Sequence, residues 1–238
     1  MINSIKADMY RLFRSKTVWL VICLFLALQV RAVFTLKPFE PIFDTHFVEA
    51  SSPFSDLKLI SYNYGVLIES IFTVGTLVCS MYSEGLLKNS IICGKSIKKI
   101  PIYKTVTAIY INTSILFIQN FTIYILNLLL HKGYRSTFFP NVLLVTLWQA
   151  VPVIGWTCFL IFIAAVVRKY SYFLAAIFVP LIALSSGIRT GYYLPTVIMG
   201  YIVYEPYVGF RIYVALFALA LSLISVFLFW LHTNRRTE

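Results

Sequence analysis

The sequence predicts an all-α polytopic membrane protein with six transmembrane helices, and two features of its composition lead to that class. Hydrophobic residues make up 60% of the 238 residues, and the mean hydropathy is +0.84, well above the values of soluble domains. Charged residues are only 12% of the chain. A soluble protein of this size could not bury so much apolar surface, so most of the chain is expected to face lipid.

Six apolar runs are long enough to cross a membrane, since a helix needs about 20 mainly apolar residues to span the hydrocarbon core. The predicted spans are residues 17–36, 60–82, 105–130, 140–167, 172–189 and 211–231. The third and fourth are long enough to tilt or to project beyond the lipid. Because the spans are distributed along the whole sequence, residues 1–238 are treated as a single transmembrane domain.

Residues 1–16, before the first span, have the pattern of an amphipathic helix. The apolar side carries Ile2, Ile5, Met9, Leu12 and Phe13. The opposite, mainly basic side carries Lys6, Asp8, Arg11 and Arg14. Such a helix is expected to lie in the membrane interface, with its apolar side in the lipid and its basic side attracted to anionic headgroups. The alternative is an ordinary positively charged flank of the first span.

The distribution of Lys and Arg predicts the orientation. If the N-terminus is cytoplasmic, thirteen basic residues fall on the cytoplasmic side and seven on or near the outer side. This imbalance favours both termini inside. The net charge of +11 is therefore attributed to the flanks of the spans, and no nucleic-acid partner is expected.

The connection between spans two and three, residues 83–104, contains Gly94-Lys95-Ser96, which is like the end of a phosphate-binding loop. The first glycine of that loop is replaced by Asn89, and little sequence remains for a nucleotide-binding domain. No ATPase site is therefore expected in this chain. The same segment has the pattern of a short helix with an apolar side that could press into a groove on a soluble partner. A solvated basic loop that only sets orientation is an equal alternative.

The connection between spans five and six is apolar and aromatic but interrupted by Pro and Gly. The interruptions within residues 189–210 are Gly191, Pro195, Gly200, Pro206 and Gly209. Proline and glycine at this density disfavour a spanning helix. Lipid-exposed irregular backbone is not tolerated, so short re-entrant or interfacial helices are expected on the outer side.

Polar side chains inside the spans are candidates for function, and Glu69 in the second span is the foremost. Its expected partner is Arg31 or the amides of the third span. Asn112 and Gln119 share one face of that span, and Asn120 lies on an adjacent stripe. These amides could line a substrate path or hold helices together. No catalytic set, metal site or cofactor site is expected, because no Asp pair, His/Glu set or C-x-x-C motif occurs.

Two segments resemble type-2 ABC transporter permeases, the six-span membrane subunits of many bacterial exporters. The stretch "IKADMYRLFRSK" is similar to the helix that precedes their first span, and residues 82–104 resemble their cytoplasmic loop, E-x-x-x-G-T-[IL]-[KR]-N, then G-x-[ST]-R, then a Lys that enters span three. The matching positions are Glu84, Lys88, Asn89, Gly94, Ser96 and Lys104. The chain departs from the pattern at Gly85, which directly follows Glu84, and at Ile97, where Arg is usual.

The resemblance implies a permease in the bacterial plasma membrane that pairs with an identical or related permease and with two copies of an ABC ATPase. The expected cargo is amphipathic, such as an antimicrobial peptide or a drug. Contact with the ATPase is expected from the residues that follow the second span: Glu84, Leu86, Leu87, Lys88, Asn89, Ile91 and Gly94. The alternatives are an intramembrane enzyme and a secondary transporter that needs no ATPase.

Overall fold

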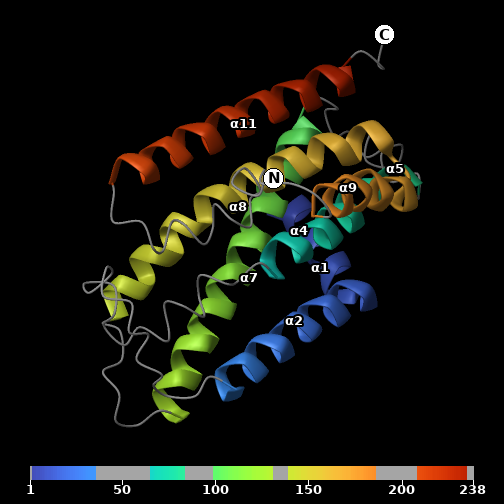
Figure 1. Cartoon of the computed structure of the whole chain (residues 1–238). Coiled ribbons are helices and arrows are strands. Elements are labelled where there is room, and N and C mark those ends of the chain that lie inside the picture. The colour runs from blue at the N-terminus through green and yellow to red at the C-terminus, as the bar shows by residue number, and fades with distance from the viewer. Residues whose placement is uncertain (1, 36–64, 84–98, 131–138, 186–207, 235–238) are drawn as a thin grey trace.

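The computed structural model describes residues 2–35, 65–83, 99–130, 139–185 and 208–234. Within these ranges the chain is helical apart from short breaks, and it contains no strand (Figure 1). The predicted ATPase-contact segment and the broken segment 189–210 fall largely outside the described residues, so both stay predictions. The all-α class is confirmed for the rest.

The helix predicted before the first span is present as a separate element. α1 (Ile2–Arg14) is followed by Ser15 and then by α2 (Lys16–Thr35), and the two helices are bent by 71°. The Trp19 indole donates to the carbonyl of Phe13 at 2.8 Å, so it bridges the bend. α1 therefore turns away from the axis of α2 instead of extending it.

The second predicted span is one helix with a wider turn in its middle. α4 (Gly65–Val74) continues as a π-helical segment, η1 (Gly75–Cys79), and then as α5 (Ser80–Ser83). This helix has the largest buried share of the candidate spans. Its apolar side chains form the main core of the described residues with those of α8 (Phe139–Val167) and α9 (Tyr170–Ser185).

α8 is the central long helix and packs against both α7 (Ile100–Leu130) and α11 (Val208–Asn234) (Figure 1). Gly155 allows α8 to approach α11 closely, because a Cβ added there would lie 3.1 Å from the Cβ of Ala218 and 3.3 Å from its carbonyl oxygen. Small residues at such contacts are typical of helix packing in membranes, where close backbone approach replaces the hydrophobic effect as the source of stability.

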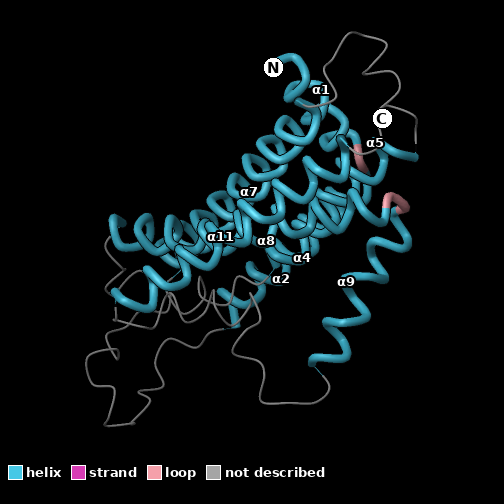
Figure 2. Tube along the Cα trace, turned by 90° about the horizontal axis from the view of Figure 1, so that it is seen from above, coloured by secondary structure: helices cyan, strands magenta, loops and turns pink. Residues whose placement is uncertain are grey.

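The turn between α8 and α9 depends on one residue with left-handed backbone geometry. Arg168 has φ 63°, and its amide donates to the carbonyl of Ala164 at 2.9 Å. This is the usual way for a helix to end, although the position commonly holds Gly. α9 then extends away from the other long helices on one side of the molecule (Figure 2). It has 16 residues, fewer than the about 20 that a perpendicular span needs.

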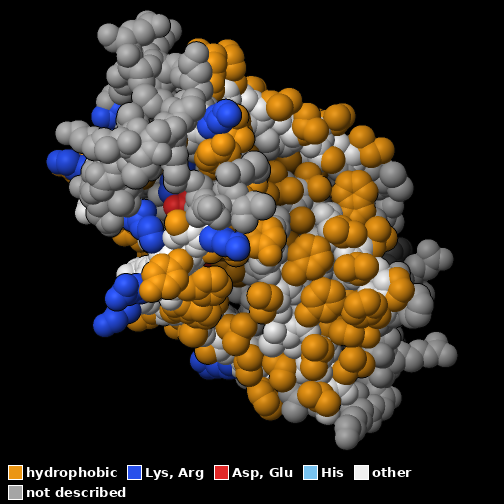
Figure 3. Space-filling view, turned by 180° about the vertical axis from the view of Figure 1, so that it is seen from behind, with side chains coloured by type: hydrophobic (Ala, Val, Ile, Leu, Met, Phe, Trp, Pro, Cys, Tyr) orange, Lys and Arg blue, Asp and Glu red, His pale blue; other side chains and the backbone are white. Residues whose placement is uncertain are grey.

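Four helices are long and apolar enough to cross a membrane, namely Gly65–Tyr82, Ile102–Leu126, Val142–Val167 and Ile212–His232. The bent pair Ile5–Arg14 and Lys16–Arg31 would make a fifth. Large apolar side chains cover the outside of α2, α7 and α11, as Figure 3 shows for one face. Membrane embedding by four or five helices is therefore supported, and the count of six remains a prediction.

Candidate functional site

A buried ion pair attaches α1 to the beginning of α7. Lys104 Nζ donates to Asp8 Oδ1 at 2.5 Å, and the two side chains are 10% and 11% exposed, respectively. The pattern of α1 had placed Asp8 on the polar side with the basic residues, but the structure buries it. Lys104 is the lysine that enters the third predicted span, so α1 is bound at that point to the helix that follows residues 84–98.

A second contact attaches α1 to the helix that precedes the same residues. Arg11 Nη2 donates to Ser80 Oγ at 2.9 Å, and the Ser80 hydroxyl donates to the carbonyl of Thr76 within the π-helical segment. The side of α1 that packs on protein therefore carries Asp8, Arg11 and the buried Leu12. Tyr10 and Phe13 lie on the exposed side. α1 thus contacts both helices that flank residues 84–98.

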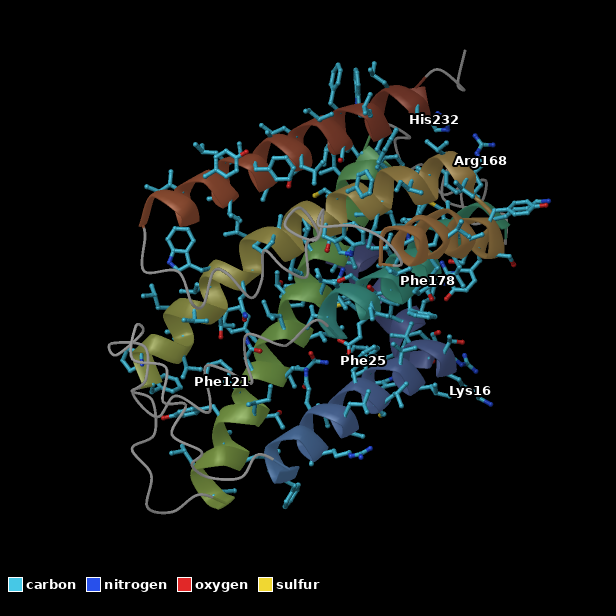
Figure 4. The ribbon with its side chains drawn as sticks, viewed as in Figure 1. Lys16, Phe25, Phe121, Arg168, Phe178 and His232 are labelled. Carbon is cyan, nitrogen blue, oxygen red and sulfur yellow. The ribbon has the colours of Figure 1, made fainter. Side chains whose placement is uncertain are left out.

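Basic side chains collect at this end of the bundle. Figure 4 shows Lys16, Arg168 and His232 toward one end of the molecule and Phe121 toward the other, and Figure 2 places α1 and α5 together. The guanidinium of Arg168 lies 5.2 Å from the ring centroid of Tyr82, a cation–π contact across the bundle. α2 therefore begins at this end of the bundle, and α8 and α11 end there.

Glu69 belongs to a second group of polar side chains, inside the bundle. Only 1% of Glu69 is exposed, and its Oε1 accepts a hydrogen bond from Gln119 Nε2 at 2.6 Å. The Gln119 carbonyl oxygen accepts in turn from Gln29 Nε2 at 3.2 Å. Of the partners expected from the sequence, one amide of the third span, Gln119, contacts Glu69, whereas Arg31 is exposed on α2.

Gln29 was not among the residues chosen from the sequence. It is the one amide side chain in α2, which was the available signal. The three linked side chains come from α2, α4 and α7, and they form a row of hydrogen bonds across these helices. The other carboxylate oxygen, Glu69 Oε2, is buried and has no hydrogen-bond partner among the described residues.

The remaining amides of α7 connect helices. Asn112 Oδ1 accepts from Thr73 Oγ1 at 2.6 Å, and its Nδ2 donates to Thr157 Oγ1 at 3.0 Å, so α4, α7 and α8 meet there. Asn112 and Gln119 both reach α4, as their shared face predicted. Asn120 Nδ2 donates to Gln149 Oε1 at 2.9 Å and to Thr146 Oγ1 at 3.1 Å, both on α8. Satisfied amides of this kind favour a helix-packing role for Asn112 and Asn120.

No protein-family model and no curated protein sequence matches this chain. In the described parts of the chain, no group of three or more His, Cys, Asp or Glu side chains could hold a metal ion. The contacts described above define two candidate functional sites. One is the attachment of α1 beside residues 84–98, and the other is the buried Glu69 group.

Proposed function

We propose that the chain is the membrane-spanning permease subunit of an ABC transporter. It would export an amphipathic substrate, such as an antimicrobial peptide or a drug, while a separate subunit binds and hydrolyses ATP. The observation that carries this proposal is the attachment of α1 to both flanks of residues 84–98, through Asp8 with Lys104 and Arg11 with Ser80. The resemblance of these two segments to type-2 permeases supports it.

A buried ion pair suits the transmission of movement. Removing one partner of such a pair costs about 3–5 kcal/mol, because the other charge is then buried alone. α1, α5 and α7 would therefore move together when an ATPase domain pushes on residues 84–98. The π-helical segment that directly precedes Ser80 would bend during such a movement. π-helical turns are often found at functional sites.

In this proposal the basic end of the bundle faces the cytoplasm, with both termini there. Two ATPase subunits dock on residues 84–98, and an identical or related permease completes the transporter. Leu86, Leu87 and Ile91 would supply the apolar part of the dock, with Glu84 and Lys88 at its rim. The chain itself would hydrolyse no ATP.

The test is to search the neighbouring genes for an ABC ATPase, to express the tagged chain together with it, and to purify the pair in nanodiscs. Association and ATP hydrolysis by the pair, with none by the permease alone, is the expected result. Hydrolysis by the isolated chain that is abolished by Lys95→Ala would contradict the proposal. Absence of any neighbouring ATPase gene, together with transport driven by an ion gradient, would favour a secondary transporter instead.

A further inference from the structure

Glu69 is the single acidic residue in the described parts of α2, α4, η1, α5, α7, α8, α9 and α11. The basic residues of these helices lie at or near their ends, at Lys16, Arg31, Lys104 and Arg211. Glu69 therefore lies in the bundle without a charged partner among the described residues. An ionisable side chain in this position is costly, and membrane proteins keep such residues mainly where they act on an ion or a substrate.

The hydrogen bonds around Glu69 all run in one direction. Gln29 donates to Gln119, and Gln119 donates to Glu69, so the carboxylate is the final acceptor of the row. Aligned donors of this kind polarise one another and orient the group at the end. Glu69 Oε1 accepts the hydrogen bond from Gln119, whereas Oε2 accepts none from the described residues. A bound group that hydrogen-bonds to Glu69 Oε2 must be a donor, and a cationic donor would form the strongest hydrogen bond with the carboxylate.

The row lies away from the basic end of the bundle. Glu69 is 14 residues before Ser83, the last residue of α5, which places it about 21 Å along the helix from that end. Gln29 is 13 residues beyond the start of α2, so it lies at a similar depth, about 20 Å from the bend. With a hydrocarbon core of about 30 Å, the site belongs to the half of the membrane opposite the basic end.

α2 is the helix that covers the site from the edge of the bundle. It packs on α1, α4 and α7, and its opposite side exposes Leu20, Leu24 and Leu28. Its contact with α4 places Phe25 against Gly65, where an added Cβ would be 2.7 Å from the ring. Gln29 is only half-buried, whereas Gln119 and Glu69 are buried. A shift of this one helix would therefore expose the carboxylate to the lipid side, from which an amphipathic molecule could enter.

We propose that Glu69 binds the cationic group, an ammonium or guanidinium, of an amphipathic substrate that enters from the membrane beside α2. Gln119 holds the carboxylate in position, and Gln29 connects this arrangement to the movable helix. This inference rests on the proposed transport function and specifies the charge of its substrate. A neutral amphipathic molecule of the same length would lack the interaction and would bind mainly through its apolar chain.

The test compares two probes that differ in charge, dodecylammonium and dodecanol, on the chain alone in nanodiscs of neutral lipid. Binding is measured by calorimetry, with empty nanodiscs as the baseline. The unaltered chain should bind dodecylammonium about tenfold or more tightly than dodecanol, the difference expected from one charge-assisted hydrogen bond. Glu69→Gln should remove this preference and leave dodecanol binding unchanged.

Ser70→Ala is the matched control, because Ser70 is buried next to Glu69 in the sequence but its hydroxyl donates to the carbonyl of Val66 in its own helix. It should keep the preference for the ammonium. Equal affinity of the unaltered chain for the two probes would overturn the inference, whether or not the Glu69 variant inserts correctly. So would a preference that Glu69→Gln retains. The assay contains no ATPase, so its failure is distinct from failure of ATPase association.

Discussion

Breaking the buried ion pair of α1 should loosen this helix without unfolding the bundle. The pair joins Asp8 to Lys104 at 2.5 Å, with about one tenth of each side chain exposed. Asp8→Ala removes the carboxylate that α1 offers to the Lys104 ammonium, and the loss of one partner from a buried pair is expected to cost about 3–5 kcal/mol. This loss of stability should affect the contact between α1 and α7, because the ion pair joins these two helices.

Amide hydrogen exchange is the appropriate measurement, since it reports the local opening of one helix. With about 1.4 kcal/mol per factor of ten, the opening equilibrium of α1 should rise roughly 10² to 10³-fold or more, while exchange in α8 should not change. Lys104→Met should have a similar effect. The double variant Asp8→Met with Lys104→Met should recover most of the loss, because replacing a buried pair by apolar residues is often neutral or stabilising.

Two results would refute this reasoning. The first is exchange in α1 that is the same in Asp8→Ala and in the unaltered chain, because the pair would then contribute nothing to the attachment. The second is a double variant as loose as the sum of the single variants, because the two residues would then act independently. In a coupled transporter, the single variants should also lower ATP-driven export more than ATP hydrolysis.

Three further predictions concern packing, backbone geometry and the ATPase contact. Gly155→Leu should destabilise the α8–α11 contact by about 1–3 kcal/mol in SDS unfolding, whereas Ala220→Leu on the exposed side of α11 should have little effect; equal effects would contradict the close approach. Arg168→Gly should be about 1 kcal/mol more stable than Arg168→Ala, because only glycine adopts φ 63° without steric cost; equal free energies of unfolding would argue against this geometry. Leu87→Ala and Ile91→Ala should each weaken retention of the ATPase about five- to thirtyfold in co-purification, and undiminished retention by both would leave residues 83–104 as a basic orienting loop.

The helical spans could be predicted well because the membrane leaves the backbone few choices. In lipid every amide and carbonyl must be hydrogen-bonded within the segment, so a long apolar run is a helix. The predicted spans 17–36 and 211–231 accordingly correspond to Lys16–Thr35 and Val208–Asn234. For the predicted span 172–189, the described helix begins at Tyr170 and reaches Ser185, and residues 186–189 lie outside the described residues.

The polar contacts inside the bundle could be predicted only in part. A period of 3.6 residues tells which side chains share a face, and it correctly placed Asn112 with Gln119. It does not tell which helix that face meets, so the partners Thr73 and Thr157 had no signal in the sequence. Gln29 stands out as the one amide side chain in α2, but the sequence does not tell that this residue meets the third predicted span.

The sequence by itself determined the all-helical class, the approximate extent of the described helices, and the separate helix at the N-terminus, because these follow from local composition and backbone hydrogen bonding. Tertiary structure alone decided that Asp8 is buried against Lys104 and that Glu69 ends a row of amides from two other helices. Both depend on how helices far apart in the chain rotate and cross. That arrangement is set by the packing of whole helices, including the wider turn at Gly75–Cys79, and no single segment encodes it.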